Sequence, residues 1–224
     1  MDIEGTTTPI EFVHTTLFGY ARVRVQDFLE RHEADAHVTA DIALLRAEYA
    51  AEQPSPNPPM ASVSAYVHWL MDHDRKSTGL KSLQGKIWEE GFRAGELKGD
   101  VFPDVPPALA RWRDQGKEIA IFSSGSVQAQ RDLFAHSTAG DLTGFIRAYF
   151  DTTTGPKTAA HSYAELSAAL GCPPSDVRFL SDVAAELDAA RAAGMQTALC
   201  VRGPAWAPAP ANDGHPVIRT FDEV

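Results

Sequence analysis

The sequence predicts an α/β fold, in which a mostly parallel sheet with helices on both faces is preceded by a mostly helical segment. Two observations support this prediction. From about residue 99 onward, short apolar runs alternate with helical patterns, and such alternation is typical of strand–helix units in a parallel sheet. Between residues 12 and 93, apolar residues instead recur at helical spacing and strand signals are few.

Four helices are expected in the first part of the chain, at residues 12–31, 40–52, 63–72 and 80–93. The apolar residues of the first recur every three or four positions, which gives that helix one face for burial. A proline-rich loop, EQPSPNPPMAS at 52–62, follows the second helix, because neither a helix nor a central strand tolerates so many prolines.

Five strands are expected in the second part, each a short apolar run bounded by polar residues, which is typical of a buried parallel strand. They are EIAIF, AYFDT, VRFLSD, TALCV and VIRTF, at residues 118–122, 148–152, 177–182, 197–201 and 217–221. A proline-led helix ending at Gly116 precedes the first strand. Helices at 126–137, 157–171 and 183–194 follow the first three strands. Sites in such sheets lie beyond the carboxyl ends of the strands, so the residues after each strand are the candidates for chemistry.

The composition limits the kinds of molecule that the protein is expected to bind. A net charge of -10 argues against a nucleic-acid or anionic-membrane surface, and it requires that any anionic substrate be held by local positive groups or a metal. Cys172 and Cys200 match no metal spacing and are expected to be buried thiols in a reducing compartment. The sequence shows neither a membrane-spanning run nor a signal peptide, nor an apolar patch or coiled-coil seam, so a cytoplasmic monomer is expected.

The first strand is followed by serines that suit an anion. Ser123 and Ser124 precede Gly125 and a helix, and free backbone N–H groups and the helix dipole at such a position attract negative charge. The alternative is that Ser126 or Ser124 only caps the helix.

Two further strand ends carry charged residues. Asp182 follows the third strand, with Glu186 one helical turn later, and this pair suits Mg²⁺, which takes few carboxylates and keeps several waters. The alternative for Asp182 is a helix N-cap. Lys157 falls in the first turn of an expected helix, where its charge opposes the helix dipole. That mild violation points to function, although a lysine at a loop edge is also common on protein surfaces.

The opening MDIEGTTTPIEF places Asp2 and Glu4 in a D-x-E before Gly5. A chain with 30 acids contains about one such pair by chance. The order and placement of all these candidates together therefore indicate a functional site more strongly than any one of them does.

The chain resembles the acireductone synthases, which are the enolase-phosphatases of methionine salvage within the haloacid dehalogenase (HAD) superfamily. The resemblance spans nearly the whole chain and is carried by DIEGTTTPIEFVHTTLFGYA, GLKSLQGKIWEEGF, IFSSGSVQAQRDLF, YFDTTTGPKTAAHSY and FLSDVAAELDAARAAGMQT. Most HAD phosphatases have Asp where this chain has Glu4. The resemblance implies a Rossmann-like catalytic core at 1–10 and 95–224, with a helical cap inserted at 11–94.

The resemblance also implies a Mg²⁺-dependent enzyme acting on 2,3-diketo-5-methylthiopentyl 1-phosphate, which is enolised and then dephosphorylated to the acireductone. Asp2 would be the nucleophile that forms an aspartyl phosphate, and Glu4 would act as general acid and then general base. Asp182 would bind Mg²⁺ together with Asp2 and Glu4. Ser123 and Ser124 would donate to the phosphate. Lys157 would bind the phosphate too and act in catalysis, because it would offset the negative charge between the nucleophile and the phosphate.

Several alternatives stay open at this stage. His14 and Lys86 are candidates for the enolisation half, but the first is also an ordinary helix residue and the second a solvated flank. The same HAD chemistry could serve another small phosphate ester. A third alternative is a truncated, non-catalytic relative that acts as a binding protein.

One departure from the family concerns the strand before the nucleophile. A HAD nucleophile ends the central strand of the sheet, yet Met1 alone precedes Asp2. Without that strand, buried backbone groups would lack partners, at about 1–3 kcal/mol each. We therefore expect that native translation begins upstream and supplies the strand.

Overall fold

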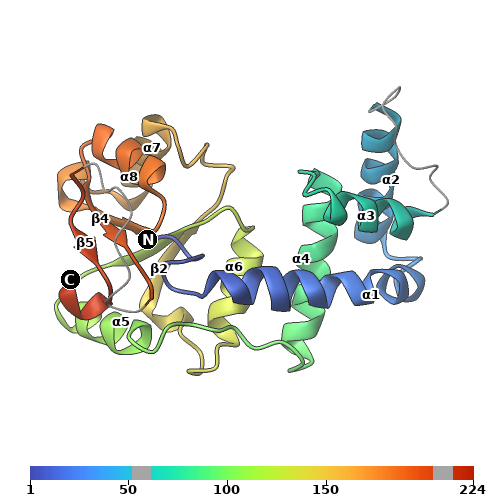
Figure 1. Cartoon of the computed structure of the whole chain (residues 1–224), viewed down its shortest axis with the longest axis horizontal. Helices are drawn as coiled ribbons and strands as arrows, with labels where there is room; N and C mark the ends of the chain where they lie inside the picture. Colours follow the sequence, from blue (N-terminus) through green and yellow to red (C-terminus); the bar gives the residue numbers. More distant parts are fainter. Residues whose placement is uncertain (52–61, 204–213) are drawn as a thin grey trace. The chain divides into compact units, whose positions relative to one another are not determined.

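The computed structural model describes residues 1–51, 62–203 and 214–224, which form two compact units (Figure 1). One unit combines Met1–Phe12 with Lys98–Val224, and the other comprises Val13–Leu97. Of the expected proline-rich loop at 52–62, residues 52–61 lie outside the described part of the chain.

The second unit is helical, as the sequence predicts. Its elements are a π-helical turn η1 (Phe12–Leu17), α1 (Phe18–Arg31), α2 (Ala36–Ala51), α3 (Val63–Asp72) and α4 (Thr78–Arg93). The bounds of α3 agree with the prediction. α2 begins earlier than predicted because Asp35 accepts hydrogen bonds from the N–H groups of His37 and Val38, at 2.7 and 3.2 Å, and so caps the helix.

The core of the helical unit is built from one face of each helix. Ala21, Val25 and Phe28 line the buried face of α1, at the helical spacing that predicted it. α4 packs against both α1 and α2, and its Leu83 and Ile87 are buried in the same cluster.

The other unit contains only parallel strand pairs among the described residues. β1 (Ile119–Phe122) pairs with β2 (Ile146–Phe150). β3 (Arg178–Ser181) pairs with β4 (Gln196–Cys200), and β4 pairs with β5 (Val217–Ile218). The predicted mostly parallel sheet is therefore confirmed.

Met1, at the marked amino end of the chain (Figure 1), and Asp2 connect these two groups of strands through hydrogen bonds. The amino group of Met1 donates to the carbonyl of Ala120, and the N–H of Phe122 donates to the carbonyl of Met1, at 2.8 and 2.9 Å. On the other side, the N–H of Asp2 donates to the carbonyl of Leu180 at 2.9 Å. These two residues thus lie between β1 and β3, and they stand where the resemblance implies the end of a central strand. The expectation of an upstream strand stays a prediction.

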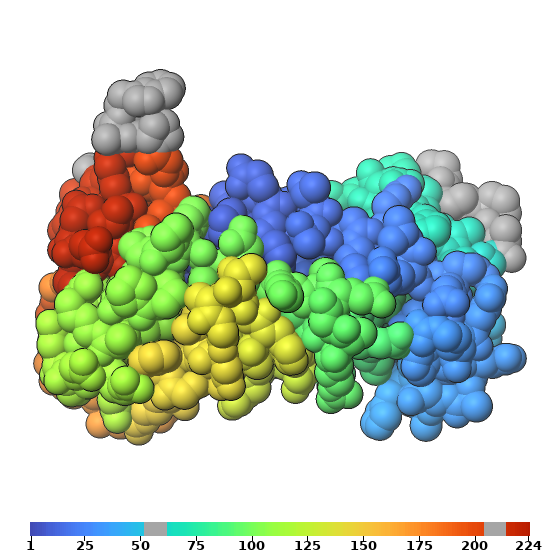
Figure 2. Space-filling view, turned by 90° about the horizontal axis from the view of Figure 1, so that it is seen from below, coloured from blue at the N-terminus to red at the C-terminus, as the bar shows by residue number. Residues whose placement is uncertain are grey.

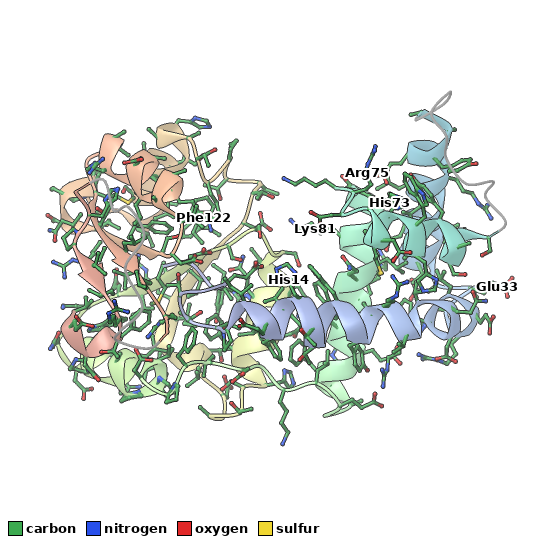
Figure 3. The ribbon with its side chains drawn as sticks, in the orientation of Figure 1. His14, Glu33, His73, Arg75, Lys81 and Phe122 are labelled. Carbon is green, nitrogen blue, oxygen red and sulfur yellow. The ribbon has the colours of Figure 1, made fainter. Side chains whose placement is uncertain are left out.

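Helices cover the strands of this unit. They are α5 (Val105–Asp114), α6 (Val127–Ala135), α7 (Ala160–Leu170) and α8 (Ala184–Ala192), with short 3₁₀ turns η2 (Thr143–Phe145), η3 (Pro174–Asp176) and η4 (Phe221–Glu223). α5 packs on β1, α6 on β2, and α8 on both β3 and β4. Phe122, at the end of β1, lies inside this unit (Figure 3), where it packs edge-on to Tyr163 with the ring centroids 5.6 Å apart.

Three further expectations are corrected by the structure. The stretch 217–221 is a strand only at Val217–Ile218, because the chain then bends into η4, which the Thr220 capping box begins. The helix expected from Lys157 begins at Ala160, so Lys157 precedes it. Cys172 is partly exposed and only Cys200 is buried, both as free thiols. Among the described helices, none is both long and apolar enough to cross a membrane.

Candidate active site

Asp2 lies at the carboxyl ends of β1 and β3 and is 4% exposed. The chain turns sharply behind it, because the carbonyl of Ile3 accepts the N–H groups of Thr6, Thr7 and Thr8 at 3.1, 2.9 and 2.9 Å. Gly5 completes the turn at a φ of +65°, in the left-handed region that favours glycine. The turn therefore fixes Asp2 and Glu4 at the edge where parallel sheets bind ligands.

Lys157 lies between two buried carboxylates. Its Nζ is 2.6 Å from Asp2 Oδ1 and 2.8 Å from Glu186 Oε2. Ser181 also donates to Glu186 Oε2, at 2.9 Å. Burial alone lowers the pKa of Lys157, but the two carboxylates outweigh it and raise that pKa above its ordinary value. Lys157 is therefore a fixed positive charge beside Asp2, and Glu186 holds it there.

The first turn of α7 holds the Lys157 segment in place. Ser162, which is fully buried, donates to the carbonyl of Pro156 at 2.8 Å, and the Tyr163 hydroxyl donates to the carbonyl of Lys157 at 2.7 Å. Gly155, at a φ of +138°, packs directly against Ser162, so a side chain would not fit there. The segment 155–157 is thus tied to the helix that follows it.

We expect Tyr163→Phe to loosen Lys157 without unfolding the protein. The substitution keeps the ring but leaves the Lys157 carbonyl without this donor, at a cost of about 1 kcal/mol in the free energy of unfolding. Phosphate release should also fall severalfold. Urea unfolding and a phosphate assay measure both effects.

Tyr149→Phe is the matched control, because among the described residues its buried hydroxyl has no hydrogen-bond partner. Its stability should be unchanged or slightly higher. Equal effects of the two substitutions would show that the Tyr163 hydroxyl does not hold Lys157.

Asp182 follows β3 and faces the opening turn. A Cβ on Gly5 would lie 2.5 Å from Asp182 Cγ and closer still to its carboxylate oxygen. Burial, followed by the negative charge of Asp2, raises the pKa of Asp182 to about 6. The residue before α8 is Val183, whose N–H donates to Ser181 Oγ, so Asp182 is not the N-cap of that helix. Its carboxylate instead joins an acid-rich site that contains one lysine.

The serines after β1 divide into two roles. Ser126 is the N-cap of α6, accepting from the N–H of Ala129 at 3.2 Å, which confirms the capping alternative for that residue. Ser123 is buried, and its Oγ accepts from the N–H of Gly125 at 3.3 Å. Asp151, which follows β2, accepts from the N–H of Val127 at 3.2 Å. The N-terminal end of α6 therefore already has a carboxylate beside it. An anion bound at this edge of the sheet would depend instead on the hydroxyl groups of Ser123 and Ser124 and on the Lys157 ammonium.

The remaining candidates lie in different places. Glu4 follows Asp2 by two residues, is partly exposed, and its charge contributes to the raised pKa of Asp182. His14, labelled in Figure 3, is exposed on η1, and its ring packs edge-on to that of Phe18. Lys86, in the helical unit, is paired with the buried Asp41 at 2.5 Å and donates to Ser82 at 2.9 Å. It is therefore not a solvated flank.

Three residues near the site were not predicted from the sequence, namely Asp151, Tyr163 and Gln130. Asp151 could have been found, since it ends the strand AYFD as Asp182 ends RFLSD. Gln130 donates to the carbonyls of both Gly125 and Phe150, at 2.8 Å each. Gln130 and Tyr163 lie inside helices and donate to backbone carbonyls outside those helices. No sequence pattern around them therefore indicates these contacts.

Comparison with known proteins first defines the class of the chain. The family model described as haloacid dehalogenase-like hydrolase matches residues 1–194. A crystal structure of the unknown transcript 4 protein of Saccharomyces cerevisiae is similar over 100% of this chain and 97% of that chain, with a TM-score of 0.79 and 33% identity. The fold is thus that of a HAD-like hydrolase.

Relatives then give the particular family. Enolase-phosphatase E1 of Synechococcus elongatus is 54% identical, over 100% of this chain and 95% of the relative. Enolase-phosphatase E1 of Sorangium cellulosum is 47% identical over the same shares. The chain belongs to the enolase-phosphatase family of HAD-like hydrolases, and the resemblance seen in the sequence is confirmed.

Proposed function

We propose that this chain is a Mg²⁺-dependent enolase-phosphatase that converts 2,3-diketo-5-methylthiopentyl 1-phosphate to 1,2-dihydroxy-3-keto-5-methylthiopentene and inorganic phosphate. One observation carries the proposal: the Lys157 ammonium is 2.6 Å from the Asp2 carboxylate at the ends of parallel strands. A positive charge there lets an anionic phosphate approach an anionic nucleophile. The relatives named enolase-phosphatase support the choice of substrate.

Asp2 and Glu4 have different roles in the transfer of the phosphoryl group. An Asp2 oxygen attacks phosphorus, the bond from phosphorus to the ester oxygen breaks, and Glu4 gives that oxygen a proton. Water then attacks the phosphorus of the aspartyl phosphate while Glu4 takes a proton from the water. The bond from phosphorus to Asp2 breaks, which releases inorganic phosphate and restores both carboxyl groups.

Asp2, Asp182 and the backbone carbonyl or side chain of Glu4 would hold the Mg²⁺ ion. Within residues 1–51, 62–203 and 214–224, no three His, Cys, Asp or Glu side chains could enclose a metal by themselves. The set still fits Mg²⁺, because this ion takes one or two carboxylates and keeps waters or substrate oxygens as its other ligands. The raised pKa of Asp182, caused by burial and by the Asp2 charge, fits a site short of positive charge. When bound, Mg²⁺ offsets charge on the phosphoryl group and polarises substrate oxygens.

Residues 11–94 would serve as the cap and contribute to enolisation. Enolisation requires a base for the proton beside a carbonyl and a donor for the developing enolate. Lys86 is paired with the buried Asp41, and an ammonium held by a carboxylate suits a donor better than a base. His14 is exposed and remains a candidate base. We further propose a cytoplasmic monomer acting on a small phosphorylated metabolite.

An assay with two substrates tests the proposed function. Purified protein with saturating Mg²⁺ is given the diketo phosphate and, separately, a generic phosphomonoester. We expect phosphate release together with enediol absorbance from the diketo phosphate. Hydrolysis of the generic ester alone would indicate a HAD phosphatase for another substrate, and turnover of neither would favour a binding protein.

We expect Asp2→Asn to lower phosphate release from the diketo phosphate by at least about 10³-fold, because an amide cannot serve as the nucleophile. The rate is measured as inorganic phosphate. Asp114→Asn is the control, since the Asp114 side chain is 76% exposed and should leave the rate unchanged. Release by Asp2→Asn at the original rate would show that the nucleophile is assigned wrongly.

A further inference from the structure

Arg202, which follows β4, carries a buried guanidinium at the back of the Asp2–Glu4 turn. Its side chain is 9% exposed. The guanidinium lies over two aromatic rings, 4.5 Å from the centroid of Phe102 and 4.4 Å from that of Phe221. A buried arginine is uncommon unless all of its donors are used, so its partners indicate what it does.

Two of these donors meet one carbonyl of the turn. Arg202 Nε and Nη2 donate to the carbonyl oxygen of Thr6, at 2.9 and 2.6 Å. Its Nη1 donates to Asp104 Oδ2 at 2.7 Å and to the carbonyl of Arg219 at 3.1 Å. The residue is therefore a bridge between the turn, the start of α5 and the segment after β5.

The turn has a second external anchor close by. The N–H of Phe102 donates to the carbonyl of Thr7 at 2.9 Å. Inside the turn, the carbonyl of Thr8 accepts from Gly5. Arg202 thus holds Thr6, which lies two residues after Glu4 in the same short loop, so a shift of Thr6 would move Glu4.

We infer that Arg202 is a positioning residue for the Asp2–Glu4 turn, setting the place of Glu4 relative to Asp2 through the Thr6 carbonyl. The inference rests on the proposed phosphatase function. Misplacement of a reacting group by about 1 Å can cost about 100-fold in rate, so an anchor of this kind acts on the chemical step more than on substrate binding.

Arg202→Met removes the guanidinium and keeps an apolar stem beside the two rings. We expect kcat for phosphate release to fall about 10- to 100-fold, while KM changes by less than about threefold. Hydrogen exchange of the backbone N–H groups in the peptide containing residues 3–8 should become at least about tenfold faster. Exchange is measured on the full chain with Mg²⁺ present.

Arg111→Met is the matched control. Arg111 donates to the carbonyl of Phe221 at 2.5 Å and pairs with Asp222 at 3.3 Å. It therefore anchors the same C-terminal segment, but within the described residues its hydrogen bonds and ion pair do not reach the turn. Figure 2 shows this segment, in red, against the yellow-green surface that contains α5. Arg111→Met should leave kcat within about twofold and exchange at residues 3–8 unchanged. Equal losses in both variants would reduce Arg202 to an anchor of the C-terminal segment and overturn the inference.

Arg202→Lys provides a second test of the inference if the methionine variant does not fold. Lysine retains the charge but cannot give the two-pronged contact to Thr6, so an intermediate loss of kcat and intermediate exchange are expected. Wild-type kcat and exchange in Arg202→Lys would overturn the inference. An inactive wild-type protein would instead contradict the proposed function, and the exchange data would still report on the anchor.

Discussion

Lys157→Met should lower phosphate release by about 10³-fold at saturating Mg²⁺. The ammonium is 2.6 Å from Asp2 and 2.8 Å from Glu186, and its side chain is only 10% exposed. Its removal leaves an anionic nucleophile facing an anionic phosphate, and the loss of one such stabilising group in an active site typically costs 10²–10³-fold, or about 3–4 kcal/mol. Initial rates of phosphate release measure the effect.

The same substitution should also destabilise the fold. It leaves two buried carboxylates without their cation, and breaking a buried ion pair typically costs about 3 kcal/mol or more. Urea unfolding of the metal-free protein measures this loss.

Lys117→Met is the control, because Lys117 is exposed. It should change neither the rate nor the stability measurably. A Lys157→Met protein that is stable and retains more than about a tenth of the wild-type rate would contradict the role given to Lys157.

Gly5→Ala should remove most activity by a different route. The new methyl group would lie 2.5 Å from Asp182 Cγ, so either Asp182 or the turn must move. The φ of +65° adds backbone strain for alanine of about 1–2 kcal/mol. We expect phosphate release to fall by more than about 100-fold. The Mg²⁺ concentration for half-maximal activity should rise, because either movement changes the spacing between Asp182 and the turn residues Asp2 and Glu4.

Gly19→Ala is the matched control for this substitution. Gly19 lies in α1, and a Cβ there meets no described atom within 4 Å, so alanine should stabilise the helix by up to about 1 kcal/mol. Thermal unfolding and Mg²⁺ titrations of activity compare the two variants. Unchanged Mg²⁺ dependence in Gly5→Ala would contradict a Mg²⁺ site shared by Asp182 and the turn residues Asp2 and Glu4.

The helices and strands could largely be predicted because their signals are local. Val63–Asp72 follows the apolar pattern of one helical face, and the strands IAIF, RFLS and TALC are short apolar runs closed by polar residues. The errors fall where one side chain sets a boundary. Asp35 starts α2 early, and Thr220 turns the chain after β5 into η4.

The kinds of element, their order and the polar residues that end the strands could be predicted from the amino-acid pattern, because periodicity and capping depend on neighbours a few residues apart. Three contacts required the assembled fold: Lys157 pairs with Glu186 as well as Asp2, Asp151 accepts from the first residue of α6, and Arg202 donates to Thr6. These partners are 24 to 196 positions apart, and parallel pairing brings such distant strand ends to one edge of the sheet. No pattern among neighbouring residues shows which strands lie side by side. The contacts that shape the site can therefore be seen only in the assembled sheet.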